Sequence, residues 1–254
     1  MKIAVTGKGG VGKTTFAALL AYAYTQAGCR VLAVDADPDA NLASTLRFTN
    51  AELITPLSRL DDLIEERTGS RPGTYGALFK INPTVADLPE KLWVEEHGIR
   101  LMVMGGVKKG GGGCVCPESV FLKSFIQHLI LYRDEVVIMD MEAGVEHLGR
   151  ATAAAVQACI VVVEPGKRSL ETARRIRSLA QEIGIKYVPV VGNRVRNEHE
   201  QQLIRGELTD FPVLGFLPYD ENVIEADQKN LFLWQHCPQL LEEVKRILNT
   251  LDKQ

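Results

Sequence analysis

The chain has 254 residues, of which 46% are hydrophobic and 24% charged, and its formal net charge is −3. These values are typical of a soluble globular protein with a full core, and the charge argues against a surface built to bind nucleic acid. No apolar run has the length of a membrane-spanning helix, and the N-terminus shows no secretory leader. Together with five cysteines, an odd number, this predicts a cytoplasmic protein with reduced thiols and with neither nucleic acid nor a membrane as partner.

The N-terminal segment carries the most specific motif. An apolar run at 3–5 leads into the sequence GKGGVGKT at 7–14, and a stretch with helical character follows from Phe16. Between a strand and a helix, this pattern is a phosphate-binding loop, whose N–H groups and helix N-terminus favour anionic oxygens. We expect Lys13 to reach the β- and γ-phosphates of a nucleotide and the Thr14 hydroxyl to bind Mg²⁺. The nucleotide-binding residues of this loop are then Gly9, Gly10, Val11, Gly12, Lys13, Thr14 and Thr15.

Apolar runs alternate with helical stretches along the rest of the chain, a pattern typical of a parallel sheet. Further strands are predicted at 30–35, 99–104, 136–140, 159–164, 187–191 and 213–217. Helices are predicted at 57–68, 117–132, 147–156 and 169–183, and from about 221 and 240. Scattered prolines and glycines indicate a loop-rich insertion at about 69–97. The expected fold is α/β, a single domain over 1–254 built on a doubly wound, mostly parallel sheet with helices on both faces.

Acidic residues stand at the ends of two predicted strands. Asp140 follows four apolar residues and is placed to hold the hydration shell of Mg²⁺. Asp35, Asp37 and Asp39 cluster after another strand, where carboxylates are costly unless they meet a cation or a reacting water. We assign Asp37 to orient the attacking water beside the magnesium, with Asp35 or Asp39 in support. Gly144, just after Asp140, offers a switch N–H that senses a γ-phosphate.

An amide side chain near the end of a later strand indicates which base is bound. Asn193 follows the apolar segment 188–192, and an amide presents both a donor and an acceptor to a purine edge. A guanine-reading N-K-x-D motif is absent, because Arg196 occupies its fourth position. The sequence therefore favours adenine, and hence ATP.

These motifs together resemble the deviant Walker A ATPases of the MinD type. The resemblance depends on Lys8 inside the phosphate-binding loop and on the segments 37–42 and 140–144, and it extends over most of the chain. It implies a doubly wound fold and an ATP-sandwich homodimer in which Lys8 crosses to the partner's phosphates. It implies four further roles: Asp37 as the hydrolytic residue, Asp140 as the Mg²⁺-shell acid, and Asn193 and the loop around Pro218 as adenine contacts.

The cysteine pair Cys114 and Cys116 is the second specific feature. In an extended segment both thiols face the same side, but two thiolates are too few for a zinc or iron–sulfur tetrahedron. A symmetric dimer supplies four, a soft donor set that suits Ni²⁺, Zn²⁺ or Cu(I). The other cysteines, Cys29, Cys159 and Cys237, are isolated and are interpreted as structural.

The pair, together with the sequence DMEAGVEH at 140–147, is similar to the CooC group of this family. These ATPases insert nickel into carbon monoxide dehydrogenase, and close relatives serve acetyl-CoA synthase. The resemblance implies that Cys114 and Cys116 of a homodimer bind Ni²⁺, with Zn²⁺ as the other candidate, for one of these client enzymes. We favour an ordinary polar role for His147 over metal relay. An iron–sulfur scaffold or reductase-type ATPase, or a MinD- or ParA-like positioning ATPase, is the alternative.

Overall fold

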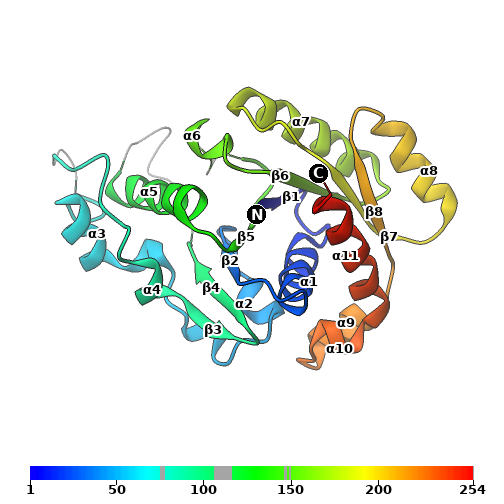
Figure 1. Cartoon of the computed structure of the whole chain (residues 1–254), viewed down its shortest axis with the longest axis horizontal. Coiled ribbons are helices and arrows are strands. Elements are labelled where there is room, and N and C mark those ends of the chain that lie inside the picture. The colour runs from blue at the N-terminus through cyan, green and yellow to red at the C-terminus, as the bar shows by residue number, and fades with distance from the viewer. Residues whose placement is uncertain (75–77, 106–115, 146–147, 149, 254) are drawn as a thin grey trace.

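The computed structural model of the chain describes residues 1–74, 78–105, 116–145, 148 and 150–253 (Figure 1). In this part an eight-stranded sheet has the order β3-β4-β2-β5-β1-β6-β7-β8. Neighbouring strands are parallel except β3 and β4, which are antiparallel. The strands are β1 (Lys2–Thr6), β2 (Val31–Asp35), β3 (Val94–Glu96), β4 (Ile99–Val103), β5 (Val136–Asp140), β6 (Ala158–Val163), β7 (Val190–Val195) and β8 (Val213–Pro218).

Helices cover both faces of the sheet, so the predicted doubly wound fold is confirmed (Figure 1). One buried cluster joins α3, α5, α6, α7 and α8 to one face, and a second joins α1, α2, α10 and α11 to the other. The helices are α1 (Lys13–Gln26), α2 (Leu42–Thr45), α3 (Asp61–Thr68), α4 (Pro89–Leu92), α5 (Pro117–Tyr132), α6 (Arg150–Ala153), α7 (Lys167–Ile183), α8 (Glu198–Glu207), α9 (Asn222–Gln228), α10 (Leu233–His236) and α11 (Pro238–Leu251), with 3₁₀ turns at Ala51–Leu53 and Leu57–Arg59.

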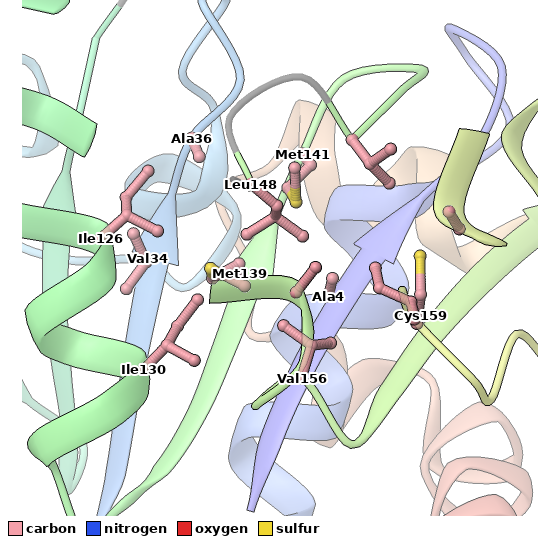
Figure 2. Packing of buried hydrophobic residues seen from close by; sticks show 14 of the residues in the cluster. Ala4, Val34, Ala36, Ile126, Ile130, Met139, Met141, Leu148, Val156 and Cys159 are labelled. Carbon is pink, nitrogen blue, oxygen red and sulfur yellow. The ribbon is translucent and has the colours of Figure 1, made fainter. Parts of the chain in front are cut away.

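The central strands are buried on both faces, as parallel strands between two helical layers must be. Figure 2 shows Ile126 and Ile130 of α5 beside Val34 of β2, with Met139 of β5 in the same cluster. Strands held in this way keep their carboxyl ends fixed, and the loops that leave those ends carry the predicted site.

Two predicted elements have different bounds for local reasons. The helix predicted at 57–68 is a 3₁₀ turn followed by α3, because Leu60 (φ −86°, ψ 63°) leaves the helical region between them. The strand predicted at 187–191 is β7 instead, because Pro189 has no N–H to continue a ladder at that end. At its other end β7 passes through Arg194 (φ 56°), where its register with β8 shifts.

The remaining differences lie in the connections. Among the described residues the helix predicted at 147–156 is the short α6, and the segment 69–97 includes α4 and the edge strand β3. The short helices α2 and α10, and the polar helix α8, have no counterpart in the sequence prediction. No helix in the described ranges is both long and apolar enough to cross a membrane.

Candidate functional site

The phosphate-binding loop joins β1 to α1 at the carboxyl edge of the sheet. Gly7 has φ +148°, and a Cβ there would lie 2.4 Å from the Val162 carbonyl oxygen. Gly12 has φ +87°, and a Cβ there would lie 2.3 Å from Asn193 Nδ2. Both positions therefore require glycine, and the loop is pressed against β6 and β7.

The two lysines of this loop have different environments. The Lys13 side chain is 8% exposed, and its Nζ lies 3.9 Å from Asp37 Oδ2, so its charge faces the acidic loop after β2. Lys8 is exposed, and within the described part of the chain its side chain makes no ion pair or hydrogen bond. Lys13 is placed to contact a phosphate bound by its own chain, whereas the Lys8 side chain points outward.

Asp35 and Asp140 end the adjacent strands β2 and β5 in direct register, and both are fully buried. Burial raises the pKa of Asp35 to about 7, and the nearby Asp140 adds to the rise, although N–H groups of Leu42 and Asp37 oppose it. Those N–H groups donate to Asp35 at 2.8 and 3.3 Å. Asp35 thus organises the loop that carries Asp37. The sequence analysis named Asp35 only as a possible support, with Asp39 as the alternative, for Asp37 in orienting the attacking water.

Asp140 lacks such partners. Among the described groups neither of its carboxylate oxygens has a hydrogen-bond partner. Burial raises its pKa to about 6; the nearby Thr14 hydroxyl and Lys13 charge lower it, but Thr14 does not complete a hydrogen bond of good geometry. The Asp140 carboxylate oxygens are buried and receive no hydrogen bond from the described residues, and they lie next to a threonine hydroxyl. Such oxygens are the ligands that Mg²⁺ prefers.

Asp37 lies between the phosphate-binding loop and solvent. Its side chain is 21% exposed and accepts a hydrogen bond from the Asp39 N–H at 3.1 Å. Asn41 closes the same turn by donating to the Asp39 carbonyl oxygen at 2.8 Å. A partly exposed carboxylate beside Lys13 can meet both a phosphate-bound lysine and a water molecule, as the assigned role requires.

Gly144, the predicted switch residue, has its N–H directed into the chain. This N–H donates to the Glu142 carbonyl oxygen at 2.8 Å and to Thr6 Oγ1 at 3.2 Å. Sequence reasoning did not identify Thr6, although a threonine that ends the strand before a phosphate-binding loop was a visible signal.

Asn193 and Pro218 lie near the carboxyl ends of β7 and β8. Asn193 is buried and donates from Nδ2 to the Val11 carbonyl oxygen at 2.7 Å, so it contacts the phosphate-binding loop directly. Pro218 lines a hollow of about 400 Å³ together with Tyr219, Asp220, Glu221, Asn222, His236, Pro238 and Gln239. The structure brings both predicted base contacts to the same edge of the sheet as the loop.

The cysteines divide into two groups. Cys114 and His147 lie outside the described residues, while Cys116 is half-buried and immediately precedes α5. Burial raises the pKa of Cys159 to about 12 and that of Cys237 to about 11, as expected for inert structural thiols. Within the described ranges, no three histidine, cysteine or acidic side chains gather as a metal site.

The match to known proteins agrees with this geometry. Residues 2–233 match the CobQ/CobB/MinD/ParA nucleotide binding domain family. The chain belongs to this family. The family is described as a nucleotide binding domain, which agrees with the phosphate-binding motif at 7–14.

Two individual proteins are similar to this chain over most of their length. The chain is 53% identical over 230 residues to an uncharacterized ATP-binding protein of Methanocaldococcus jannaschii, covering 89% of this chain and 88% of that protein. It is 42% identical over 253 residues to the carbon monoxide dehydrogenase accessory protein CooC of Rhodospirillum rubrum, covering 99% of this chain and 96% of CooC. The resemblance to the CooC group is therefore confirmed.

Solved structures of the family share the fold at low identity. The MinC:MinD cell division complex of Aquifex aeolicus aligns with a TM-score of 0.71 at 17% identity, over 100% of this chain and 96% of that chain. A ParA family ATPase from Chlorobium tepidum aligns with a TM-score of 0.70 at 18% identity, over 100% and 99% of the two chains. At such identities the alignments establish the architecture alone.

Proposed function

We propose that this chain is an ATP-driven metallochaperone. It binds and hydrolyses ATP as a homodimer in the cytoplasm, carries Ni²⁺ on Cys114 and Cys116 at the dimer interface, and delivers it to carbon monoxide dehydrogenase or acetyl-CoA synthase. The observation that carries the delivery step is the 42% identity, over nearly the whole of both chains, to an accessory protein of carbon monoxide dehydrogenase.

The part of this proposal that concerns ATP binding and hydrolysis depends on the phosphate-binding loop and the acidic residues around it. The loop amides and Lys13 would bind the phosphates, and Asn193 and the hollow beside Pro218 would bind the base. Asp37 would orient a water for in-line attack on the γ-phosphorus, so that the bond to the β–γ bridging oxygen breaks and ADP and phosphate leave. The outward-facing Lys8 supports the proposal of a dimer, because its side chain can reach the phosphates of a nucleotide bound by a second chain.

Thr14 and Asp140 fit the magnesium that accompanies ATP. When bound, Mg²⁺ neutralises phosphate charge and positions the phosphates. In the chain itself, burial raises the pKa of the Asp140 carboxyl to about 6, and a nearby positive charge favours its ionised form. Lys13 supplies part of that charge from the neighbouring loop.

The metal-binding part of the proposal depends on the pair Cys114 and Cys116. Nickel here is cargo, so its ligands must hold it in one state of the dimer and release it in another. Two cysteines from each chain would form a four-thiolate site when ATP closes the dimer, and hydrolysis would open it.

The direct test is anaerobic nickel titration of the full chain, with and without a non-hydrolysable ATP analogue. We expect one Ni²⁺ per dimer, and a paired Cys114→Ser, Cys116→Ser variant should lose it while keeping nucleotide affinity. Cys29→Ser, which removes another half-buried thiol, is the matched control. Nickel binding that survives the paired substitution would refute the assignment, and a preference for iron would favour the scaffold alternative.

The delivery step needs its own experiment. Nickel-free carbon monoxide dehydrogenase and acetyl-CoA synthase are each mixed with the nickel-loaded chain and ATP, and recovery of client activity is followed. Asp37→Asn should abolish ATP-dependent recovery while leaving nickel loading intact. Recovery at the same rate without ATP would contradict the coupling.

A further inference from the structure

A buried hydroxyl connects the strand before the phosphate-binding loop to the switch glycine. Thr6 ends β1 and is fully buried. Its Oγ1 donates to the Glu142 carbonyl oxygen at 2.6 Å and accepts from the Gly144 N–H at 3.2 Å. One side chain thus uses both of its hydrogen-bonding capacities on the three residues 142–144.

The switch N–H is already satisfied in this arrangement. Besides Thr6 Oγ1, it has the Glu142 carbonyl oxygen as an acceptor at 2.8 Å, which closes a tight turn. Met141, Val145 and Leu148 on either side are buried in the core, and Figure 2 shows Met141 and Leu148 near one another. The short turn between these anchors can therefore change without unfolding its flanks.

Thr6 itself cannot follow such a change. β1 lies between β5 and β6 in the sheet. The next residue, Gly7, is so close to the Val162 carbonyl oxygen that even a Cβ would not fit. If the turn at 142–144 moves toward a nucleotide, its hydrogen bonds to Thr6 must break.

We propose that Thr6 is a positioning residue that holds the Gly144 N–H in an inward state, and that the γ-phosphate of a bound nucleoside triphosphate competes with the Thr6 hydroxyl for this N–H. An anionic phosphate oxygen is a stronger acceptor than a hydroxyl, so a triphosphate releases the turn and a diphosphate does not. The inference rests on the nucleotide-binding part of the proposed function and needs neither nickel nor a client enzyme.

The test compares Thr6→Val, which removes the hydroxyl at nearly constant shape, with Thr6→Ser, which keeps it. Affinities for Mg-ADP and for a non-hydrolysable Mg-ATP analogue are measured on the full chain. Because Thr6→Val removes both hydrogen bonds that join the turn to Thr6 in the inward state, the preference for triphosphate over diphosphate should rise at least about fivefold in Thr6→Val and stay unchanged in Thr6→Ser. Thr25→Val, which removes a hydroxyl that donates to the Ala21 carbonyl oxygen within α1, is the control.

The ratio of the two affinities separates positioning from a purely structural role. Equal losses of both affinities in Thr6→Val, or a lower preference for triphosphate, would overturn the proposal. A wild-type chain that binds neither nucleotide would instead refute the proposed function.

The wild-type chain supplies a second measurement if Thr6→Val fails to fold. With ¹⁵N-labelled glycine, the amide signal of Gly144 should shift, and its hydrogen exchange should change, on adding the triphosphate analogue but not ADP. Identical responses to the two nucleotides would overturn the proposal independently of any variant.

Discussion

Replacing Asp140 by asparagine should stabilise the nucleotide-free chain at high pH, even though it should prevent ATP hydrolysis. Asp140 is fully buried, its oxygens have no hydrogen-bond partner among the described groups, and burial raises its pKa from 3.8 to about 6. At about 1.4 kcal/mol for each pH unit, the ionised carboxylate then lowers the free energy of unfolding by roughly 3 kcal/mol.

The amide in Asp140→Asn carries no charge but still lacks partners, which costs roughly 1–2 kcal/mol at every pH. At pH 8 the variant should therefore be about 1–2 kcal/mol more stable than the wild type. The sign changes with pH, because an acid whose folded-state pKa is raised destabilises the fold fully above that pKa and not at all below its unfolded value. At pH 4.5, where the folded wild type holds the proton, the gain should vanish or reverse.

The assay is urea unfolding of both chains at pH 8 and pH 4.5, without nucleotide or divalent cation. Asp39→Asn, an exposed acid two residues beyond Asp37, is the control and should show no such pH dependence. Adding Mg²⁺ with ADP should raise the stability of the wild type more than that of Asp140→Asn. A stability difference that is the same at both pH values, or a variant that is less stable at pH 8, would refute the reasoning.

Two further predictions concern the phosphate-binding loop. Lys8→Ala should keep nucleotide affinity within about twofold yet lose ATP-dependent dimerisation and hydrolysis, because the exposed side chain would act on the partner's phosphates. Light scattering measures the dimerisation and phosphate release measures the hydrolysis. The control Lys186→Ala, which changes another exposed lysine, should behave as wild type, and a Lys8→Ala variant that is monomeric but fully active would contradict the prediction. Gly10→Ala should lower the free energy of unfolding by about 1–2 kcal/mol, because an alanine is strained at the Gly10 φ of +82°. Gly12→Ala should lower it by about 1 kcal/mol more, because the added Cβ would meet Asn193 Nδ2 and break the hydrogen bond from Asn193 to the Val11 carbonyl oxygen. Urea unfolding measures both, and equal losses would count against the contact with Asn193.

The parts of the site that could be predicted are those encoded in one continuous stretch. The loop at 7–14 contains its own glycines, lysine and threonine, and its position between β1 and α1 follows from the apolar residues on either side. The strand-end position of Asp140 was predicted for a similar reason, because an acid after four apolar residues falls at the end of a buried strand.

The parts that could not be predicted arise from pairing between distant segments. Thr6 and Gly144 are 138 residues apart in sequence, and their contact exists because β1 and β5 are neighbours in the sheet. The bounds of β7 were wrong for two local reasons. The prediction ran through Pro189, which is visible in the sequence but has no N–H for the ladder, and Arg194 adopts φ 56°, which an apolar run does not reveal. Cys114, which lies outside the described residues, stays a prediction.

The position of Asp35 offers a route by which a bound nucleotide would influence the metal site proposed at Cys114 and Cys116. Its carboxylate holds the N–H groups of Asp37 and Leu42, while its own carbonyl oxygen accepts from the Met104 N–H at 2.8 Å. Met104 precedes Cys114 by ten residues in the sequence. A displacement of the Asp37 loop by a nucleotide and its magnesium would therefore strain the end of β2, and this backbone hydrogen bond would pass the strain to Met104. We expect hydrogen exchange at the Met104 amide to differ between the ATP-bound and ADP-bound states.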